Sequence, residues 1–225
     1  MTISEDEWYA FYLILNDAPG ESAPHTWSVY RLPENILLAQ GSTPAFNPAE
    51  WTQVRLLFSD NQLAFLLNDQ PFAYFIAPTL ENIRKHITIG AVSKASPMTL
   101  YLNDLQLWDL DNLSASASPQ PDLDFLAYKA PDIQDHFSVI DSHWQITAGG
   151  TGLDNGQLSL VTTSDGYARI RHPALSARDF QVRYDFQVLS QGSDQAIVSL
   201  EFRITELSKY VFSVSFEPDQ ARWDL

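Results

Sequence analysis

Four charged residues occupy alternate positions on two consecutive predicted strands. They are Arg183, Asp185, Glu201 and Arg203. Successive residues of a strand point to opposite faces, so all four would share one face if the strands at 179–189 and 195–205 pair. Guanidinium donors and carboxylate acceptors on one face suit a hydroxyl-rich ligand such as a glycan. The competing interpretation is a cross-strand charge ladder, worth about 0.2–1 kcal/mol per pair.

Two histidines and two aspartates form a second candidate cluster, made of Asp135, His136, Asp141 and His143. A metal site needs three or four converging ligands, and the alternative is a solvated loop. Asp109 and Asp111 begin like a calcium-binding loop, but Leu113 then stands at a ligand position and Gln120 stands where the pattern needs Glu. We therefore expect no metal and no cofactor.

Other catalytic patterns are missing from the sequence. The glycines at 149–152 lack the Lys-Ser/Thr pair and the following helix of a phosphate loop. No G-x-S-x-G elbow occurs, and the absence of cysteine excludes disulfides and thiolate chemistry. The chain is accordingly expected not to be an enzyme.

Period-two alternation dominates the chain and predicts the elements that position these residues. The strongest case is Phe180, Val182, Tyr184, Phe186 and Val188, with polar residues between them. Strands with one apolar and one polar face belong to antiparallel sheets with one face toward water. The predicted strands are 8–15, 27–32, 35–39, 51–58, 62–68, 71–76, 86–92, 98–108, 143–147, 157–162, 167–172, 179–189, 195–205 and 210–216.

Local signals refine this pattern. The residues from Asn68 to Pro71 predict a tight hairpin turn. The apolar phase slips between Leu102 and Leu105, which predicts a β-bulge near Asn103. The one helical candidate is a short turn at 79–85. Together these features predict an all-β, antiparallel β-sandwich.

The tryptophans divide into two groups by position. Trp8, Trp51, Trp108 and Trp144 stand in or at the start of predicted strands and are expected in the core. Trp27 follows a polar loop; core or edge packing is the favoured interpretation, and stacking on a sugar ring is the alternative.

Composition narrows the partners. Hydrophobic residues make up 45% of the chain, enough to bury a core, and 28 acidic residues against 13 basic ones give a net charge of −15. Such a field repels phosphate groups, so nucleic acid and anionic membranes are not expected as partners, whereas neutral glycans and basic partners remain open. No apolar run is long enough for membrane insertion, and residues 1–7 lack the features of a signal peptide.

A Ser- and Pro-containing stretch at 111–134 predicts a linker between segments 1–110 and 135–225. Tyr9, Phe11 and Leu13 match Tyr210, Phe212 and Val214 in spacing, at an offset of 210 − 9 = 201 residues. The chain thus returns near its end to the pattern with which it begins.

Several short motifs resemble concanavalin A-like jelly-roll sandwich domains, the group related to family-16-type glycoside hydrolases and laminin-G-like modules. In the later segment the motifs are Asp135-His136-Phe137-Ser138, Trp144, Asp154-Asn155-Gly156-Gln157-Leu158, Asp179-Phe180 and Phe202-Arg203. In the earlier segment they are Trp51, Leu67-Asn68-Asp69, Ile89-Gly90 and Asp104-Leu105-Gln106-Leu107-Trp108. The halves stand in reversed order, which indicates either a permuted sandwich or a segment of a tandem array.

The resemblance implies a ligand-binding sheet face that includes Phe202-Arg203. The related hydrolases carry acid and nucleophile as E-x-D-x-x-E, and no such string occurs here. The expected function is a non-catalytic carbohydrate-binding or adhesion module of a larger bacterial protein, exported or in the cell envelope. Two alternatives stay open: a structural, protein-interaction or sensor module, and a glycoside-processing domain. Other domains of the same polypeptide are expected partners.

Overall fold

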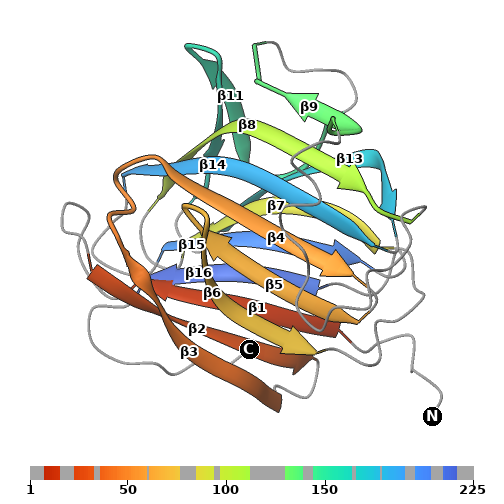
Figure 1. Ribbon diagram of the computed structural model, residues 1–225. Helices are drawn as coiled ribbons and strands as arrows, with labels where there is room; N and C mark the ends of the chain where they lie inside the picture. The colour runs from red at the N-terminus through yellow and green to blue at the C-terminus, as the bar shows by residue number, and fades with distance from the viewer. Residues whose placement is uncertain are drawn as a thin grey trace.

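The computed structural model of the protein is a β-sandwich of two stacked sheets (Figure 1). It describes residues 8–15, 23–32, 36–59, 61–76, 85–93, 97–111, 130–138, 144–163, 166–177, 179–190, 196–203 and 210–216, and of β1, β15 and β16 it describes the backbone alone. The described residues form strands and turns, and none of them is helical. Hence none of them forms a helix that could cross a bilayer.

The first sheet, sheet A, contains eight strands. In spatial order they are β10 (Gln145–Ala148), β13 (Gly166–Ala177), β7 (Lys85–Ser93), β15 (Ala196–Arg203), β16 (Tyr210–Phe216), β1 (Trp8–Leu15), β2 (Ala23–Leu32) and β3 (Ile36–Phe46).

The second sheet, sheet B, has seven strands in series and one more beside β8. In spatial order they are β11 (Gly150–Asp154), β12 (Gln157–Val161), β8 (Thr99–Asp109), β14 (Phe180–Ser190), β4 (Thr52–Ser59), β5 (Gln62–Leu67) and β6 (Gln70–Ile76). The short β9 (Ile133–Asp135) pairs with β8.

Strands from the two chain segments alternate in both sheets. In sheet B, β14 of the later segment lies between β8 and β4 of the earlier one. In sheet A, β7 of the earlier segment lies between β13 and β15 of the later one. Separating the segments would therefore break pairings in the middle of each sheet.

The two strands with matching sequence, β1 and β16, are neighbours (Figure 1). They pair in parallel, with Phe11 opposite Phe212 and Leu13 opposite Val214. Each also pairs antiparallel with the strand beside it in the chain, β1 with β2 and β16 with β15. We refer to the parallel pairing as the β1–β16 seam.

The core lies between the sheets and is built on the alternation of β14. Phe180, Val182, Tyr184 and Phe186 are fully buried. Phe58 stacks on Phe180, with ring centroids 5.9 Å apart. Burial of each such side chain stabilises the fold by about 1.5–3 kcal/mol.

The local signals at the hairpin and the bulge are confirmed. Asn68 and Asp69 both have positive φ, 48° and 62°, and Leu67 pairs with Gln70, as a two-residue hairpin turn requires. The register of β8 against β14 shifts between Asn103 and Gln106. The helical candidate at 79–85 lies, up to residue 84, outside the described residues.

Two short strands were not predicted. The glycine-rich stretch at 149–152, which lies outside the predicted strands, forms most of β11, which pairs with β12. Gly149 has a φ of 72° and lies so close to Ala168 that a side chain there would clash. The three residues of β9 carry too short an alternation to stand out in the sequence.

One core residue offers a direct test of this packing. The hydroxyl of Tyr184 is buried without a hydrogen-bond partner, and burial raises the pKa of this phenol. An unsatisfied buried polar group costs about 1–3 kcal/mol. We expect Tyr184→Phe to raise the free energy of unfolding by about 1 kcal/mol in a urea titration. Tyr101→Phe is the control, because that hydroxyl donates to Asp154 at 2.8 Å, and it should not be stabilising.

Candidate functional site

The four charged residues singled out from the sequence do not come together. The expected pairing of 179–189 with 195–205 is wrong, since β14 belongs to sheet B and β15 to sheet A. The backbone of Glu201 lies opposite Thr88 and Val211. The side chains of Glu201 and Arg203 are outside the described part of the structure. Consecutive strands pair in a hairpin, but here the connection crosses between the sheets.

Arg183 and Asp185 instead join other polar residues on the outer face of sheet B. Arg183 lies opposite Arg55 of β4, and Asp185 lies opposite Gln53. Their neighbours in β14 point into the core, so these four point away from it. Asp104 joins them from the bulge of β8, with a φ of 46°. We call this group the polar strip; it consists of Gln53, Arg55, Asp104, Arg183 and Asp185.

Hydrogen bonds and ion pairs connect the strip to elements on either side. Arg183 Nη2 lies 3.4 Å from one carboxylate oxygen of Asp104, and His136 Nδ1 lies 3.1 Å from the other. The amide of Gln53 donates to Asp185 at 3.4 Å. Arg55 pairs with Asp69 of the hairpin turn. Together with these partners, the strip forms a network that extends from the end of β9 to the β5–β6 turn.

Two features of the strip oppose stability. Arg55 and Arg183 stand directly opposite each other, an arrangement in which like charges repel. Their Nε atoms are buried and have no hydrogen-bond partner. The side chains of Arg55 and Arg183 are 17% and 26% exposed. Two cationic donors are therefore held side by side at a partly open surface.

Asp185 is partly buried in the strip, and this environment disfavours its charged form. Burial raises the pKa of its carboxyl above the ordinary value, and the charge of Asp104 acts in the same direction. The hydrogen bond from Gln53 and the charge of Arg183 lower the pKa in part. Costly polar placements of this kind are typical of functional positions.

The outer face of sheet B is open over only part of its length. Beyond the strip, four apolar residues form a buried cluster on this face: Leu57, Ala64, Trp108 and Leu110. Gln181, one step from Arg183 on the outer side of β14, is also buried. A ligand on this face is consequently confined to the end at which β4 begins.

The motif at 135–138 helps to hold the fold together. Asp135 accepts hydrogen bonds from the backbone N–H of Phe137 and from the indole N–H of Trp144, both at 2.6 Å. The rings of Phe137 and Trp144 lie 5.9 Å apart, and Trp144 is buried as expected. With Asp135 engaged in this way and His136 directed to Asp104, the two do not share a site. Asp141 and His143 lie outside the described residues.

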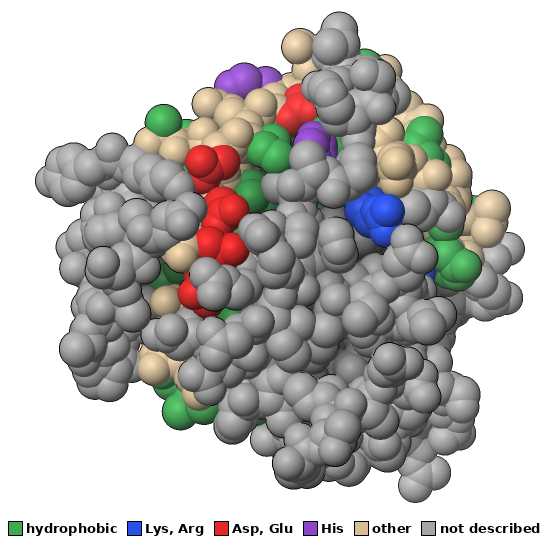
Figure 2. All heavy atoms as spheres, turned by 90° about the vertical axis from the view of Figure 1, so that its right-hand side faces the viewer, with side chains coloured by type: hydrophobic (Ala, Val, Ile, Leu, Met, Phe, Trp, Pro, Cys, Tyr) green, Lys and Arg blue, Asp and Glu red, His purple; other side chains and the backbone are tan. Residues whose placement is uncertain are grey.

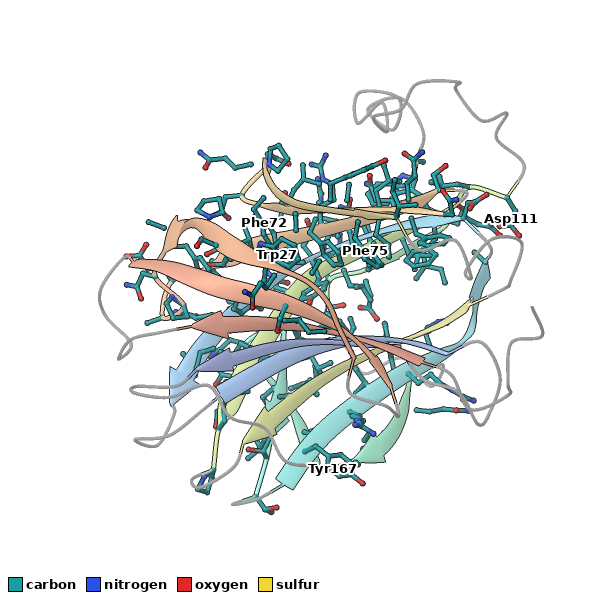
Figure 3. All side chains as sticks on the ribbon, turned by 90° about the horizontal axis from the view of Figure 1, so that it is seen from below. Trp27, Phe72, Phe75, Asp111 and Tyr167 are labelled. Atoms are coloured by element: carbon teal, nitrogen blue, oxygen red, sulfur yellow. The ribbon has the colours of Figure 1, made fainter. Side chains whose placement is uncertain are left out.

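Aspartates also gather at the end of sheet B toward which β4 and β8 run, and Figure 2 shows acidic side chains grouped on this side. Asp132 accepts from the N–H of Asp109, and Asp109 from that of Asp111. Asp111, labelled in Figure 3, accepts from the N–H of Asp179 at 2.9 Å. These bonds tie the ends of β8 and β14 together. No group of three metal-ligating residues occurs among the described residues.

Trp27 lies where the sequence favoured it, and Trp51 does not. Trp27 packs partly buried against the core together with Phe72 and Phe75, and Figure 3 shows the three between the two layers. This position confirms the favoured interpretation of Trp27, packing against the core. Trp51, expected in the core, is 39% exposed. It precedes β4 by one residue, so the register that buries Thr52 leaves Trp51 outside.

No family model matches the chain, and no curated protein matches it. A solved structure, described as the complete structure of manganese lipoxygenase of Gaeumannomyces graminis and the partial structure of zonadhesin of Komagataella pastoris, is similar over 88% of this chain, with 12% identity and a TM-score of 0.28. The match covers 56% of that chain. A TM-score this low carries no argument, so the concanavalin A-like resemblance stays a prediction.

The raised pKa of Asp185 predicts that the effect of replacing this residue on stability depends on pH. A raised pKa in the folded state means that the native protein loses stability as pH rises from below the unfolded pKa, about 3.9, through the folded pKa. Asp185→Asn should therefore unfold at higher urea concentration than the unaltered protein at pH 7. The advantage should shrink toward zero below about pH 3, where both side chains are neutral. A constant difference across this range would contradict the assignment.

Because Asp135 accepts two hydrogen bonds, replacing it is expected to lower the stability of the fold. Asp135→Ala leaves the N–H groups of Phe137 and Trp144 without their acceptor, and we expect a loss of about 2 kcal/mol in chemical denaturation. Asp154→Ala is the control. Asp154 accepts a hydrogen bond from the hydroxyl of Tyr101 at an exposed position, so its replacement should lower stability by less than about 1 kcal/mol. Equal effects would show that Asp135 is not an anchor.

Proposed function

We propose that this chain is a non-catalytic carbohydrate-binding or adhesion module that holds its ligand on the polar strip. The observation that carries the proposal is the pair of half-buried residues Arg183 and Asp185, placed at a cost to stability on one open face. Guanidinium and carboxylate groups together match the donors and acceptors of sugar hydroxyls. Glu201 and Arg203 have no part in this strip, since β15 belongs to the other sheet.

The charge of the site favours an uncharged ligand. Two arginines in the strip are accompanied by Asp69, Asp104 and Asp185, and the whole chain carries −15. A polyanion would meet both the local carboxylates and the long-range field. A neutral glycan can bond to both kinds of group without that repulsion.

The finer description of the fold belongs to the same proposal. Two stacked and mostly antiparallel sheets, together with the motifs quoted above, support a concanavalin A-like jelly roll with its halves in reversed order. The proposal places the module in a larger bacterial protein, exported or in the cell envelope, where such modules meet glycans. No reaction is proposed, because the chain lacks the paired-carboxylate string of the related hydrolases.

A protein-interaction module is the second candidate, favoured by the edge of sheet B. The edge strand β6 exposes Tyr74 at 43% and Ile76 at 51%. Exposed apolar edge strands accept an added strand from a partner. Protection of β6 amides from hydrogen exchange by a partner, with no effect of glycans, would favour this candidate.

A glycan array followed by calorimetry tests the proposal. We expect binding to a neutral glycan, with the variant Arg183→Ala/Asp185→Ala weakening it at least about tenfold, or 1.4 kcal/mol. The milder variant Arg183→Lys/Asp185→Asn guards against misfolding and should also weaken binding. Arg169→Ala is the control, because Arg169 lies over Tyr167 in sheet A.

Three results would contradict the proposal. One is the absence of glycan binding, and another is binding that survives both double variants. The third is hydrolysis of the glycan that is abolished by a single Asp or Glu substitution.

A further inference from the structure

Trp51 stands at the open end of the face that carries the polar strip. It is 39% exposed, whereas its neighbour Thr52 is buried against the core. Alternation continues from β4 through this residue, with Gln53 and Arg55 on the outer side. Trp51 therefore lies on the same side of sheet B as Gln53, two residues along the chain.

The segment that presents Trp51 is held firmly. Asn47 accepts from the N–H of Ala49 and, through its carbonyl, from that of Glu50, both at 3.0 Å. Gln187 of β14 donates its side-chain amide to the carbonyl of Ala49 at 2.6 Å. The N–H of Val188 donates to the carbonyl of Pro48 at 2.9 Å. An exposed tryptophan on so well bonded a turn is pre-organised for contact with a ligand.

A second aromatic ring lies across β14. Gln187 is paired with Tyr101 of β8, and Tyr101 is half-buried, with its hydroxyl bonded to Asp154 at 2.8 Å. Neighbouring strands lie about 4.8 Å apart, and β14 separates β8 from β4. Tyr101 on β8 is therefore about 10 Å from β4. Polar groups of Gln53 and Asp185 follow one row further along. Aromatic surface and hydrogen-bonding groups thus adjoin each other.

We propose that Trp51 is the stacking platform for one sugar ring of a neutral pyranose glycan, with Asp185 and Gln53 bonding to the hydroxyls of that ring or the next. This inference rests on the proposed function and names its ligand class. The apolar face of a pyranose covers an indole ring, while its hydroxyls reach groups at the rim. The carboxylates of Asp104 and Asp185 lie beside the proposed ligand position, and they would repel an acidic sugar.

The open part of the face limits the length of the ligand. From Trp51 to Arg55 the chain advances four residues, about 14 Å at 3.4 Å per residue. The next outward residue of β4, Leu57, is buried in the apolar cluster. The ligand is therefore a short oligosaccharide or the end of a longer glycan, not a chain that crosses the whole sheet.

Calorimetry with three defined tetrasaccharides tests the inference: β-linked and α-linked glucose oligomers, and a tetragalacturonate. We expect a neutral oligomer to bind and the acidic one not to bind. Trp51→Ala should lower the affinity at least about tenfold, and Trp51→Phe, which keeps an aromatic face, should lower it less. Tyr74→Ala, the matched control, removes another exposed aromatic residue of sheet B and should leave binding unchanged.

The outcomes separate this inference from the proposed function. If Trp51→Ala binds as tightly as the unaltered protein while Arg183→Ala/Asp185→Ala does not, the platform is refuted and the glycan-binding function stands. Preference for the tetragalacturonate would overturn the neutral ligand class. If no oligomer binds while the glycan array shows binding of another neutral glycan that Trp51→Ala does not weaken, the platform is refuted and the proposed function stands. A urea titration of Trp51→Ala shows whether a loss of binding reflects a loss of folding.

Discussion

The position of β14 between β8 and β4 is the constraint on which the rest of the molecule depends. Its inner side chains are fully buried and meet both neighbouring strands, which come from the other segment of the chain. The same strand places Arg183 and Asp185 on the outer face. Core and candidate site are therefore opposite sides of one element, and the site inherits the rigidity of the core. Backbone positions set by packing hold polar groups in arrangements that those groups alone would not adopt.

That rigidity explains how unfavourable polar contacts persist. Like-charged Arg55 and Arg183 remain opposite each other because the register of β4 against β14 is fixed by the apolar residues between them. A one-residue slip would turn Phe180 and Val182 toward water, at several kcal/mol. The free energy gained by burying the core therefore offsets the unfavourable contacts of the polar strip. The same logic applies to Trp51, whose exposure follows from the burial of Thr52.

Much of the strand content followed from alternation alone, and the reasons for the failures are physical. The run from Phe180 to Val188 carries its own period and needs no knowledge of its neighbours. The pairing of β14 with β15 was wrong because adjacency in space depends on which sheet receives each strand, and alternation carries no such information. Asp104, Gln53 and Arg55 were missed for the same reason. Trp51 was assigned to the core because it stands at the start of a predicted strand. Its position two residues before the polar Gln53 would have placed it on the outer face instead.

The β1–β16 seam brings the internal repeat of the sequence into direct contact with itself. The offset between paired residues along the seam, 211 − 10 = 201, equals the offset between the matching sequence patterns. The two strands run in step, so a displacement of one strand spacing, about 4.8 Å, would bring Phe212 opposite Val29, where Phe11 now stands. Sheet A thus holds two strands of matching sequence pattern side by side between β15 and β2. A strand that took its neighbour's place in this way would keep the register with β2, because the two strands share both direction and spacing.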